Sequence, residues 1–198
     1  MRLLLVGFGF IGRNFIRAVN EKIALLKRAD KNFKVVGIAT SQGVLYSSSG
    51  LDIGKLSRLE KASQYGKEFE FRASVKDLLE DGAVDIMVVA TPTNIETGEP
   101  GLTYIKTALK NGVDVVTADK GPLVLEFWNL MELAESNDRF LMYEATVAAA
   151  LPVFSLYREC LQADRIIRIS GILNGTTNYI LSKMFFEGTS FELSLKEA

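Results

Sequence analysis

Residues 1–12, MRLLLVGFGFIG, join a short apolar run to glycines in the pattern G-x-G-x-x-G. An apolar run bounded by glycine predicts a strand that is buried on both faces, here residues 2–6. Gly7, Gly9 and Gly12 then allow a tight turn, a close approach of the backbone to a pyrophosphate, and close packing of helix on strand. The stretch therefore predicts a dinucleotide-binding βαβ unit at the start of the chain.

Beyond this stretch, apolar runs alternate with amphipathic segments. Further strands are predicted at 33–39, 84–90, 113–117, 139–144 and 165–172. Helices are predicted at 12–28, 75–80, 104–111, 123–137, 152–161, 177–186 and from 191 onward, and residues 40–66 are predicted to be irregular. The alternation predicts an α/β fold, a Rossmann-type doubly wound parallel sheet followed by the beginning of an α+β catalytic and dimerisation domain. We place the dinucleotide-binding domain at 1–145 and an incomplete second domain at 146–198.

The composition is that of an ordinary soluble globular protein, with 48% hydrophobic and 24% charged residues among 198. A net charge of −1 predicts no surface for nucleic acid or for an anionic membrane. The chain lacks histidine, which excludes His-based triads and His-containing zinc sites within it. The single cysteine, Cys160, forms no internal disulfide, and no apolar run approaches the roughly 20 residues that cross a bilayer. We expect a cytoplasmic protein that acts through lysine, acidic or hydroxyl side chains, or through a cofactor.

The end of the second predicted strand bears on the choice of coenzyme. A Rossmann site that prefers NAD carries Asp or Glu there, whereas this chain has Ala39-Thr40-Ser41. Without a carboxylate there is no repulsion against a 2′-phosphate, so NADP(H) is permitted beside NAD(H). Lys55 and Arg58 are candidates to bind that phosphate, and the alternative is that both are solvated surface charges.

Two polar loops follow the third and fourth predicted strands, at 91–94 and 117–122. Ligands of open α/β sheets bind at this edge, so Lys120 is expected near the reactive end of a bound coenzyme. There it could donate a proton or stabilise an alkoxide; alternatively it is a turn residue held by the following Gly-Pro. Further on, Glu144 stands among small residues, a setting that suits a hard cation but also simple close packing.

Five stretches together resemble homoserine dehydrogenase. They are the glycine motif, TPTNIETGEPG at 91–101, TADKGPL at 117–123, YEATVAAALP at 143–152 and GILNGTTNYIL at 171–181. The match covers nearly the whole chain in order, and its last motif is highly specific. The resemblance implies NAD(P)-dependent reduction of L-aspartate 4-semialdehyde to L-homoserine, in threonine and methionine biosynthesis. It also implies a homodimer acting on a small molecule, with no nucleic-acid or membrane partner.

The resemblance assigns roles to individual residues. Phe8, Phe10 and Ile11 would border the dinucleotide beside the glycines, and Thr91 and Lys120 would line its nicotinamide side. Lys120 matches an active-site residue of the family. The resemblance further implies a sodium or potassium ion held by Glu144 and by the backbone carbonyls of Val147, Ala149 and Leu151, and a substrate loop of Asn174, Gly175 and Thr176.

The chain departs from the family in two respects. Position 119 is Asp where the family pattern is T-A-N-K-G-P, which places a carboxylate beside Lys120 and is expected to favour its charged form. The family's substrate-holding Glu and Asp and its proton-donating lysine follow the NGTTNYI helix and have no counterpart here, so the chain resembles a shortened homoserine dehydrogenase. The alternative function is a catalytically silent dinucleotide-binding module or sensor. Another aldehyde- or amino-acid-linked dehydrogenase is disfavoured by the motif at 171–181.

Overall fold

The computed structural model describes residues 1–66 and 74–198, which form two compact units. The first unit is Met1–Tyr143 and the second is Glu144–Ala198. The division between them falls close to the domain boundary predicted at 145–146. The first unit holds the predicted dinucleotide-binding elements.

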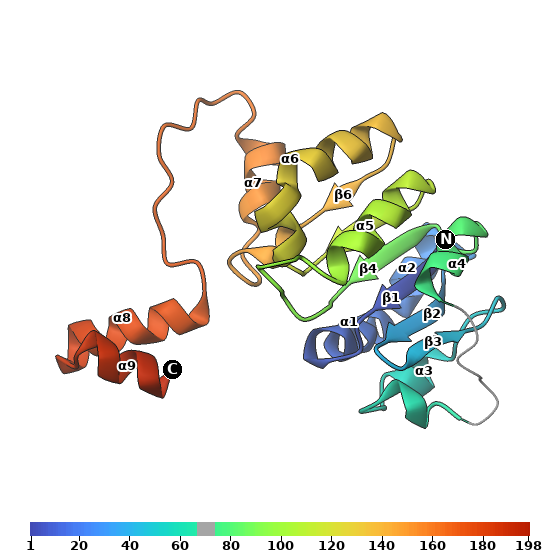
Figure 1. Cartoon of the computed structure of the whole chain (residues 1–198), viewed down its shortest axis with the longest axis horizontal. Helices are drawn as coiled ribbons and strands as arrows, with labels where there is room; N and C mark the ends of the chain where they lie inside the picture. The colour runs from blue at the N-terminus through green and yellow to red at the C-terminus, as the bar shows by residue number, and fades with distance from the viewer. Residues whose placement is uncertain (67–73) are drawn as a thin grey trace. The chain divides into compact units, whose positions relative to one another are not determined.

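A six-stranded sheet forms the centre of the first unit (Figure 1). Its strands are β1 (Arg2–Val6), β2 (Lys34–Thr40), β3 (Gly43–Tyr46), β4 (Ile86–Val89), β5 (Asp114–Thr117) and β6 (Leu141–Met142). They follow the order β3-β2-β1-β4-β5-β6, and all neighbours are parallel except β2 and β3. The chain runs outward from β1 in both directions. The switch point, where ligands bind in open α/β sheets, therefore lies between β1 and β4.

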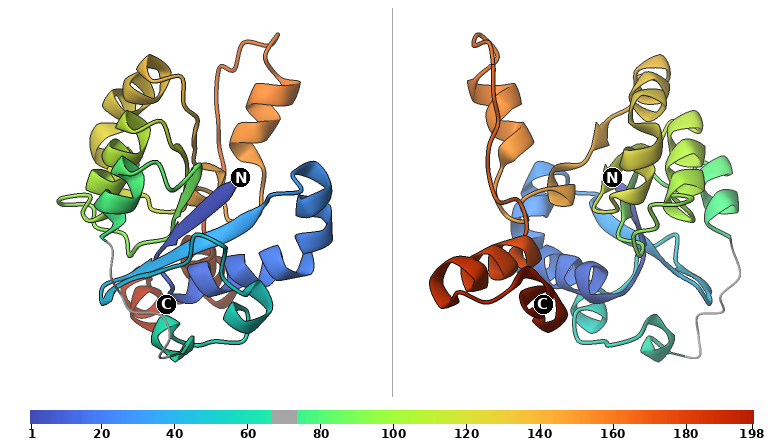
Figure 2. Two further views of the ribbon diagram at one scale, coloured as in Figure 1. Left: turned by 90° about the vertical axis from the view of Figure 1, so that its right-hand side faces the viewer. Right: turned by 60° about the vertical axis from the view of Figure 1, so that its left-hand side comes forward.

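Helices cover both faces of this sheet (Figure 2). They are α1 (Phe10–Glu21), α2 (Ile23–Ala29), α3 (Ile53–Leu56), the 3₁₀ turn η1 (Ala62–Gln64), α4 (Val75–Glu80), α5 (Gly101–Lys110) and α6 (Gly121–Ser136). One core cluster joins the sheet to α4, α5 and α6, and the other joins it to α1 and α3. Along β1, Leu4 belongs to the first cluster and Leu5 to the second, because successive strand side chains point to opposite faces. The prediction of a strand buried on both faces is confirmed.

The second unit consists of the turn η2 (Glu144–Thr146), α7 (Val153–Cys160), α8 (Gly175–Glu187) and α9 (Phe191–Glu197). The last two helices begin at capping side chains and contact each other. Asn174 Oδ1 accepts the backbone N–H of Thr177 at 2.8 Å, and Ser190 Oγ accepts that of Leu193 at 3.2 Å. Across 1–66 and 74–198, no helix combines the length and the apolar character that a membrane span requires.

The structure differs from the predicted elements in three places. Residues 165–172, predicted as a strand, have no regular structure. Their apolar run has no partner strand among the described residues, and a strand needs one to pair its backbone N–H and C=O groups. The stretch 40–66 is not wholly irregular, because a tight turn after β2 lets β3 pair with it. The predicted helix 12–28 is two helices, interrupted at Lys22.

Candidate functional site

A hollow of about 590 Å³ opens at the carboxyl edge of the sheet, at the switch point between β1 and β4. It is lined by the ends of β1, β2 and β4 and by the segments that follow them. The predicted coenzyme residues that line it are Gly7, Phe8, Gly9, Thr40 and Thr91. Sequence reasoning missed other residues of the lining, namely Gln42, Glu60, Lys61, Pro100 and Tyr104.

The glycine turn brings backbone to this hollow where α1 begins. Gly7 has a φ of +100°, and a Cβ there would lie 2.3 Å from the carbonyl oxygen of Ala90. A Cβ at Gly12 would lie 2.0 Å from the carbonyl oxygen of Gly7. Gly9 differs, because its φ of −79° suits any residue and a Cβ there would meet no atom within 4 Å. The open space beside Gly9 adjoins the N-terminus of α1, where unpaired N–H groups suit a pyrophosphate.

The other predicted coenzyme residues do not line the hollow: Phe10, Ile11, Gly12, Lys55 and Lys120. Phe10 and Ile11 project from the first turn of α1 with exposed fractions of 72% and 54%. Lys55 lies over the ring of Tyr65, with its amine 4.6 Å from the ring centre. Lys55 does not line the hollow in this structure, and its contact with a phosphate stays a prediction. Arg58 lies beside it, in a separate small depression.

Charged side chains gather on the β2 side of the hollow. Glu60 and Lys61 line it, and Glu60 pairs with Arg13 and Arg17 from α1. Gln64 fixes this segment, because its Oε1 accepts the backbone N–H groups of Glu60 and Lys61 at 3.0 and 2.9 Å. Arg13, Arg17, Glu60 and Lys61 together carry a net charge of +2, because one arginine balances Glu60. Lys61 thus brings a positive charge to the lining of the hollow on the β2 side.

Asp119 is fully buried at the carboxyl end of β5 and links two loops of the site. Its Oδ2 accepts the hydroxyl of Thr91 at 2.7 Å, and its Oδ1 accepts the backbone N–H of Gly121 at 3.0 Å. Lys120 is the exposed N-cap of α6, and within 1–66 and 74–198 no ion pair joins it to Asp119. The influence of Asp119 on Lys120 stays a prediction, and the hydrogen bonds of the carboxylate go to Thr91 and Gly121.

Glu144 serves as the cap of α7 in the second unit. Its Oε1 accepts the backbone N–H of Phe154 at 2.9 Å, and its Oε2 accepts the N–H and the hydroxyl of Ser155 at 2.8 and 2.7 Å. The Ser155 hydroxyl, followed by these backbone N–H groups and the Arg158 guanidinium, lowers the pKa of Glu144 from its usual range. The carboxylate is thus stabilised as an anion at the positive end of a helix.

Acidification is expected to fray the start of α7. Because the pKa of Glu144 is lower in the folded protein, its cap contributes stability above the ordinary glutamate pKa and loses it as pH falls through the folded value. Hydrogen-exchange protection of the Phe154 and Ser155 amides should fall over that range. Glu144→Gln should abolish the pH dependence, whereas Glu159→Gln, on the same helix, should keep it. Unchanged protection of these amides on acidification would contradict the capping role.

The predicted substrate residues lie at the start of α8. Asn174 is the N-cap, and besides the N–H of Thr177 it accepts the Thr177 hydroxyl at 3.0 Å. A Cβ at Gly175 would meet no atom within 4 Å, so the first turn of the helix is open on that side. Thr176 is exposed. Their role in binding substrate stays a prediction.

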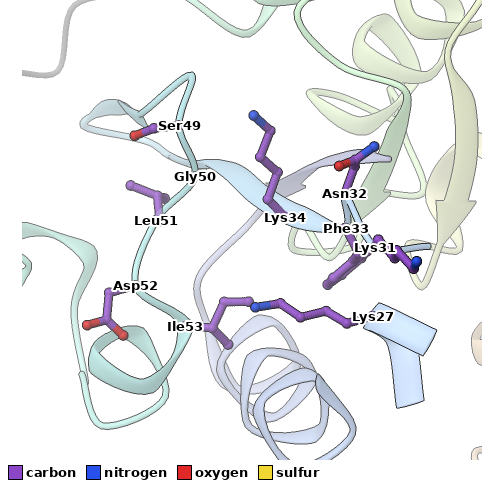
Figure 3. Close-up of a pocket in the computed structure, with 10 residues that line it drawn as sticks. All are labelled: Lys27, Lys31, Asn32, Phe33, Lys34, Ser49, Gly50, Leu51, Asp52 and Ile53. Atoms are coloured by element: carbon purple, nitrogen blue, oxygen red, sulfur yellow. The ribbon is translucent and has the colours of Figure 1, made fainter. Parts of the chain in front are cut away.

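A second hollow, of about 540 Å³, lies at the amino end of β2 (Figure 3). Lys27, Lys31 and Lys34 line it, but Figure 3 shows their amines lying apart from one another. Lys34 Nζ donates to the carbonyl oxygen of Ser48 at 2.6 Å. This hollow is at the opposite end of β2 from the carboxyl edge, and its lysines do not converge on a common ligand.

Comparisons with known proteins agree with this geometry. Residues 1–144 match the family model described as an oxidoreductase family with an NAD-binding Rossmann fold, and residues 152–198 match that of homoserine dehydrogenase. A homoserine dehydrogenase of Methanocaldococcus jannaschii is 40% identical over the whole chain, which covers 60% of that relative. The crystal structure of the Thermoplasma acidophilum homoserine dehydrogenase matches with a TM-score of 0.79 at 29% identity, over the whole chain and 59% of that protein. A hyperthermophilic archaeal homoserine dehydrogenase in complex with NADPH matches with a TM-score of 0.80 at 25% identity, again over the whole chain and 60% of that protein.

Proposed function

Because this chain belongs to an oxidoreductase family with an NAD-binding Rossmann fold, matched over 1–144, and its residues 152–198 match the model of homoserine dehydrogenase, we propose that it is a homoserine dehydrogenase that reduces L-aspartate 4-semialdehyde to L-homoserine with NADP(H) or NAD(H). The chain spans about 60% of the length of the relatives it matches, so activity and substrate are proposals for the whole protein. The observation that carries the proposal is the hollow at the switch point. There the open side of Gly9 and the N-terminus of α1 leave room and unpaired N–H groups that would suit a pyrophosphate.

The residues of this chain have distinct tasks in the proposed reaction. The coenzyme, when bound, supplies or accepts the hydride. The backbone at Gly9 and the start of α1 would bind its pyrophosphate, and Thr91, on the β4 side of the hollow, would contact its nicotinamide half. Lys120, which follows the neighbouring strand β5, is proposed to stabilise the negative charge that would develop on the substrate oxygen. The loop of Asn174, Gly175 and Thr176 is proposed to bind the amino-acid part of the substrate.

A sodium or potassium ion at Glu144, with the carbonyls of Val147, Ala149 and Leu151, remains a prediction from the family resemblance. The contacts of Glu144 do not fit it. Both carboxylate oxygens already accept hydrogen bonds from the start of α7, and the Arg158 guanidinium lies 3.8 Å from Oε2. The carbonyl oxygen of Leu151 accepts the N–H of Val153. We derive no catalytic step from a cation.

We further propose that NADP(H) binds at least as tightly as NAD(H). Thr40 lies at the end of β2, where NAD-preferring Rossmann domains carry an Asp or Glu that binds the ribose and repels a 2′-phosphate. Lys61 lines the same side of the hollow. Arg13 and Arg17 together outweigh the charge of Glu60, so these residues and Lys61 carry a net positive charge that attracts a phosphate. The complex of a hyperthermophilic archaeal homoserine dehydrogenase with NADPH supports binding of NADP(H).

The substitution Lys61→Ala is expected to weaken NADPH binding about tenfold, the usual effect of losing one charge-assisted contact. NADH binding should change little, because NADH lacks the 2′-phosphate. Titration calorimetry with both coenzymes measures the two effects, and added salt should reduce the difference. Lys55→Ala is the matched control and should leave both affinities unchanged. A clear preference of the unsubstituted protein for NADH would contradict this assignment.

We also propose that the protein is a cytoplasmic homodimer, that it acts in threonine and methionine biosynthesis, and that it has no nucleic-acid or membrane partner. The net charge of −1 and the family resemblance support these statements. Coenzyme-dependent turnover by the purified protein tests the function as a whole. Binding of coenzyme without turnover would favour a silent dinucleotide-binding module instead.

A further inference from the structure

Thr91 and Asp119 form a hydrogen-bonded pair at the edge of the coenzyme hollow. Thr91 follows β4 and lines the hollow, whereas Asp119 follows β5 and is fully buried. The Thr91 hydroxyl donates to Asp119 Oδ2 at 2.7 Å. The pair therefore connects a wall of the hollow to a carboxylate that solvent does not reach.

Asp119 is held in place on several sides. Its Oδ1 accepts the N–H of Gly121 at the start of α6, and its own N–H donates to Thr117 Oγ1 at 3.0 Å. At the start of α5, a Cβ on Gly101 would lie 2.5 Å from Asp119 Oδ2 and 3.1 Å from Thr91 Oγ1. Only glycine leaves room for the carboxylate here.

We propose that Asp119 is a positioning residue that fixes the direction of the Thr91 hydroxyl, so that Thr91 accepts a hydrogen bond from the carboxamide NH₂ of the nicotinamide. A hydroxyl has one proton and two lone pairs, and a carboxylate can only accept. Once the proton of Thr91 points to Asp119, only lone pairs remain for the hollow. In a Rossmann domain the nicotinamide half lies on the β4 side of the switch point, where Thr91 stands. The inference rests on the proposed function, because it requires a nicotinamide coenzyme.

An asparagine at position 119 would reverse this polarity. The amide oxygen would stay on the N–H of Gly121, which needs an acceptor, and the amide NH₂ would then face Thr91. Thr91 would accept from that NH₂ and direct its own proton into the hollow. Asp119→Asn therefore keeps the shape of the site while exchanging an acceptor for a donor at Thr91.

A coenzyme analogue that lacks the carboxamide NH₂ tests the inference. The 3-acetylpyridine analogue of NADP⁺ carries a methyl group in its place, so an acceptor at Thr91 would face no donor. Affinities for NADP⁺ and the analogue would be measured by calorimetry in the unsubstituted protein, Asp119→Asn, Thr91→Val and Thr91→Ser. Thr91→Val gives the preference in the absence of the hydroxyl. ADP-ribose 2′-phosphate, which has no nicotinamide, shows whether the rest of the site is intact, and thermal unfolding shows whether each variant is folded.

The measured quantity is the ratio of the affinity for NADP⁺ to the affinity for the analogue. This ratio is expected to be about tenfold higher in the unsubstituted protein and in Thr91→Ser than in Thr91→Val, because an unpaired acceptor usually costs that much. Asp119→Asn should lose this extra preference and bind ADP-ribose 2′-phosphate normally. The inference is overturned if folded Asp119→Asn keeps the preference, or if it weakens all three ligands equally. Failure of the unsubstituted protein to bind NADP⁺ and ADP-ribose 2′-phosphate would instead overturn the proposed function itself, and this inference with it.

Discussion

Coenzyme binding is expected to fall below detection in Gly9→Val, while the fold of the protein is kept. A valine Cβ at this position meets no protein atom within 4 Å, and the φ of −79° at Gly9 suits a residue with a side chain. The added methyl groups would instead fill the space beside the N-terminus of α1, where the pyrophosphate is proposed to lie. Titration with NADPH and with NADH measures the loss, and thermal unfolding measures the stability.

Gly12→Val is the matched control for this experiment. A Cβ at Gly12 would lie 2.0 Å from the carbonyl oxygen of Gly7, so α1 could not pack on β1. The free energy of unfolding should drop by about 3 kcal/mol or more, as for an overpacked core. The two variants thus separate a glycine needed for the ligand from one needed for the fold. Undiminished coenzyme binding in Gly9→Val would show that the glycines are only structural.

Lys120→Ala is expected to lower turnover at least about 100-fold, the usual contribution of a positioned catalytic group. Its effect on coenzyme affinity should be small, because an ammonium near the reacting oxygen acts mainly when charge develops there. Lys120 is exposed and pairs with no acidic residue in the described ranges, so its removal should not disturb the fold. Steady-state kinetics with homoserine and NADP⁺, together with NADPH titration, measure the two quantities.

Two further variants define the role of Lys120. Lys120→Arg keeps a positive charge but cannot supply a proton near neutral pH, so partial turnover would indicate stabilisation of an alkoxide and none would indicate proton transfer. Lys110→Ala, at the exposed end of α5, is the control and should be fully active. Full turnover by Lys120→Ala would show that the catalytic assignment is wrong.

Much of the fold could be predicted because the sequence patterns that indicate its strands and helices involve residues close together in the chain. The apolar run of β1 and the glycine turn that follows it each depend on neighbouring residues. Residues 165–172 show the limit of such reasoning. Their apolar pattern is typical of a strand, but a strand also needs a partner, and the described part of the chain pairs none with them. The antiparallel strand β3 was missed for the converse reason, since its partner β2 decides its structure more than its own composition does.

In the candidate site too, local features were predicted and features that depend on distant residues were missed. The glycine turn and Thr91 were found because motifs and strand ends place them at the carboxyl edge. Lys61 was missed because it reaches that edge only through the path of the chain after β3, held by Gln64. Asp119 precedes Lys120 in the sequence, but in the structure the Asp119 carboxylate accepts hydrogen bonds from Thr91 and Gly121. Adjacency along the chain was therefore a poor guide to the hydrogen bonds of this site.

The central claim is that this protein is a working dehydrogenase rather than a silent dinucleotide-binding module. It is tested most directly by following the reduction of NADP⁺ spectroscopically in the presence of L-homoserine, with the purified protein and its Gly9→Val variant side by side. We predict steady turnover that requires homoserine and is absent in the variant. Tight binding of NADP⁺ with no homoserine-dependent reduction would contradict the claim.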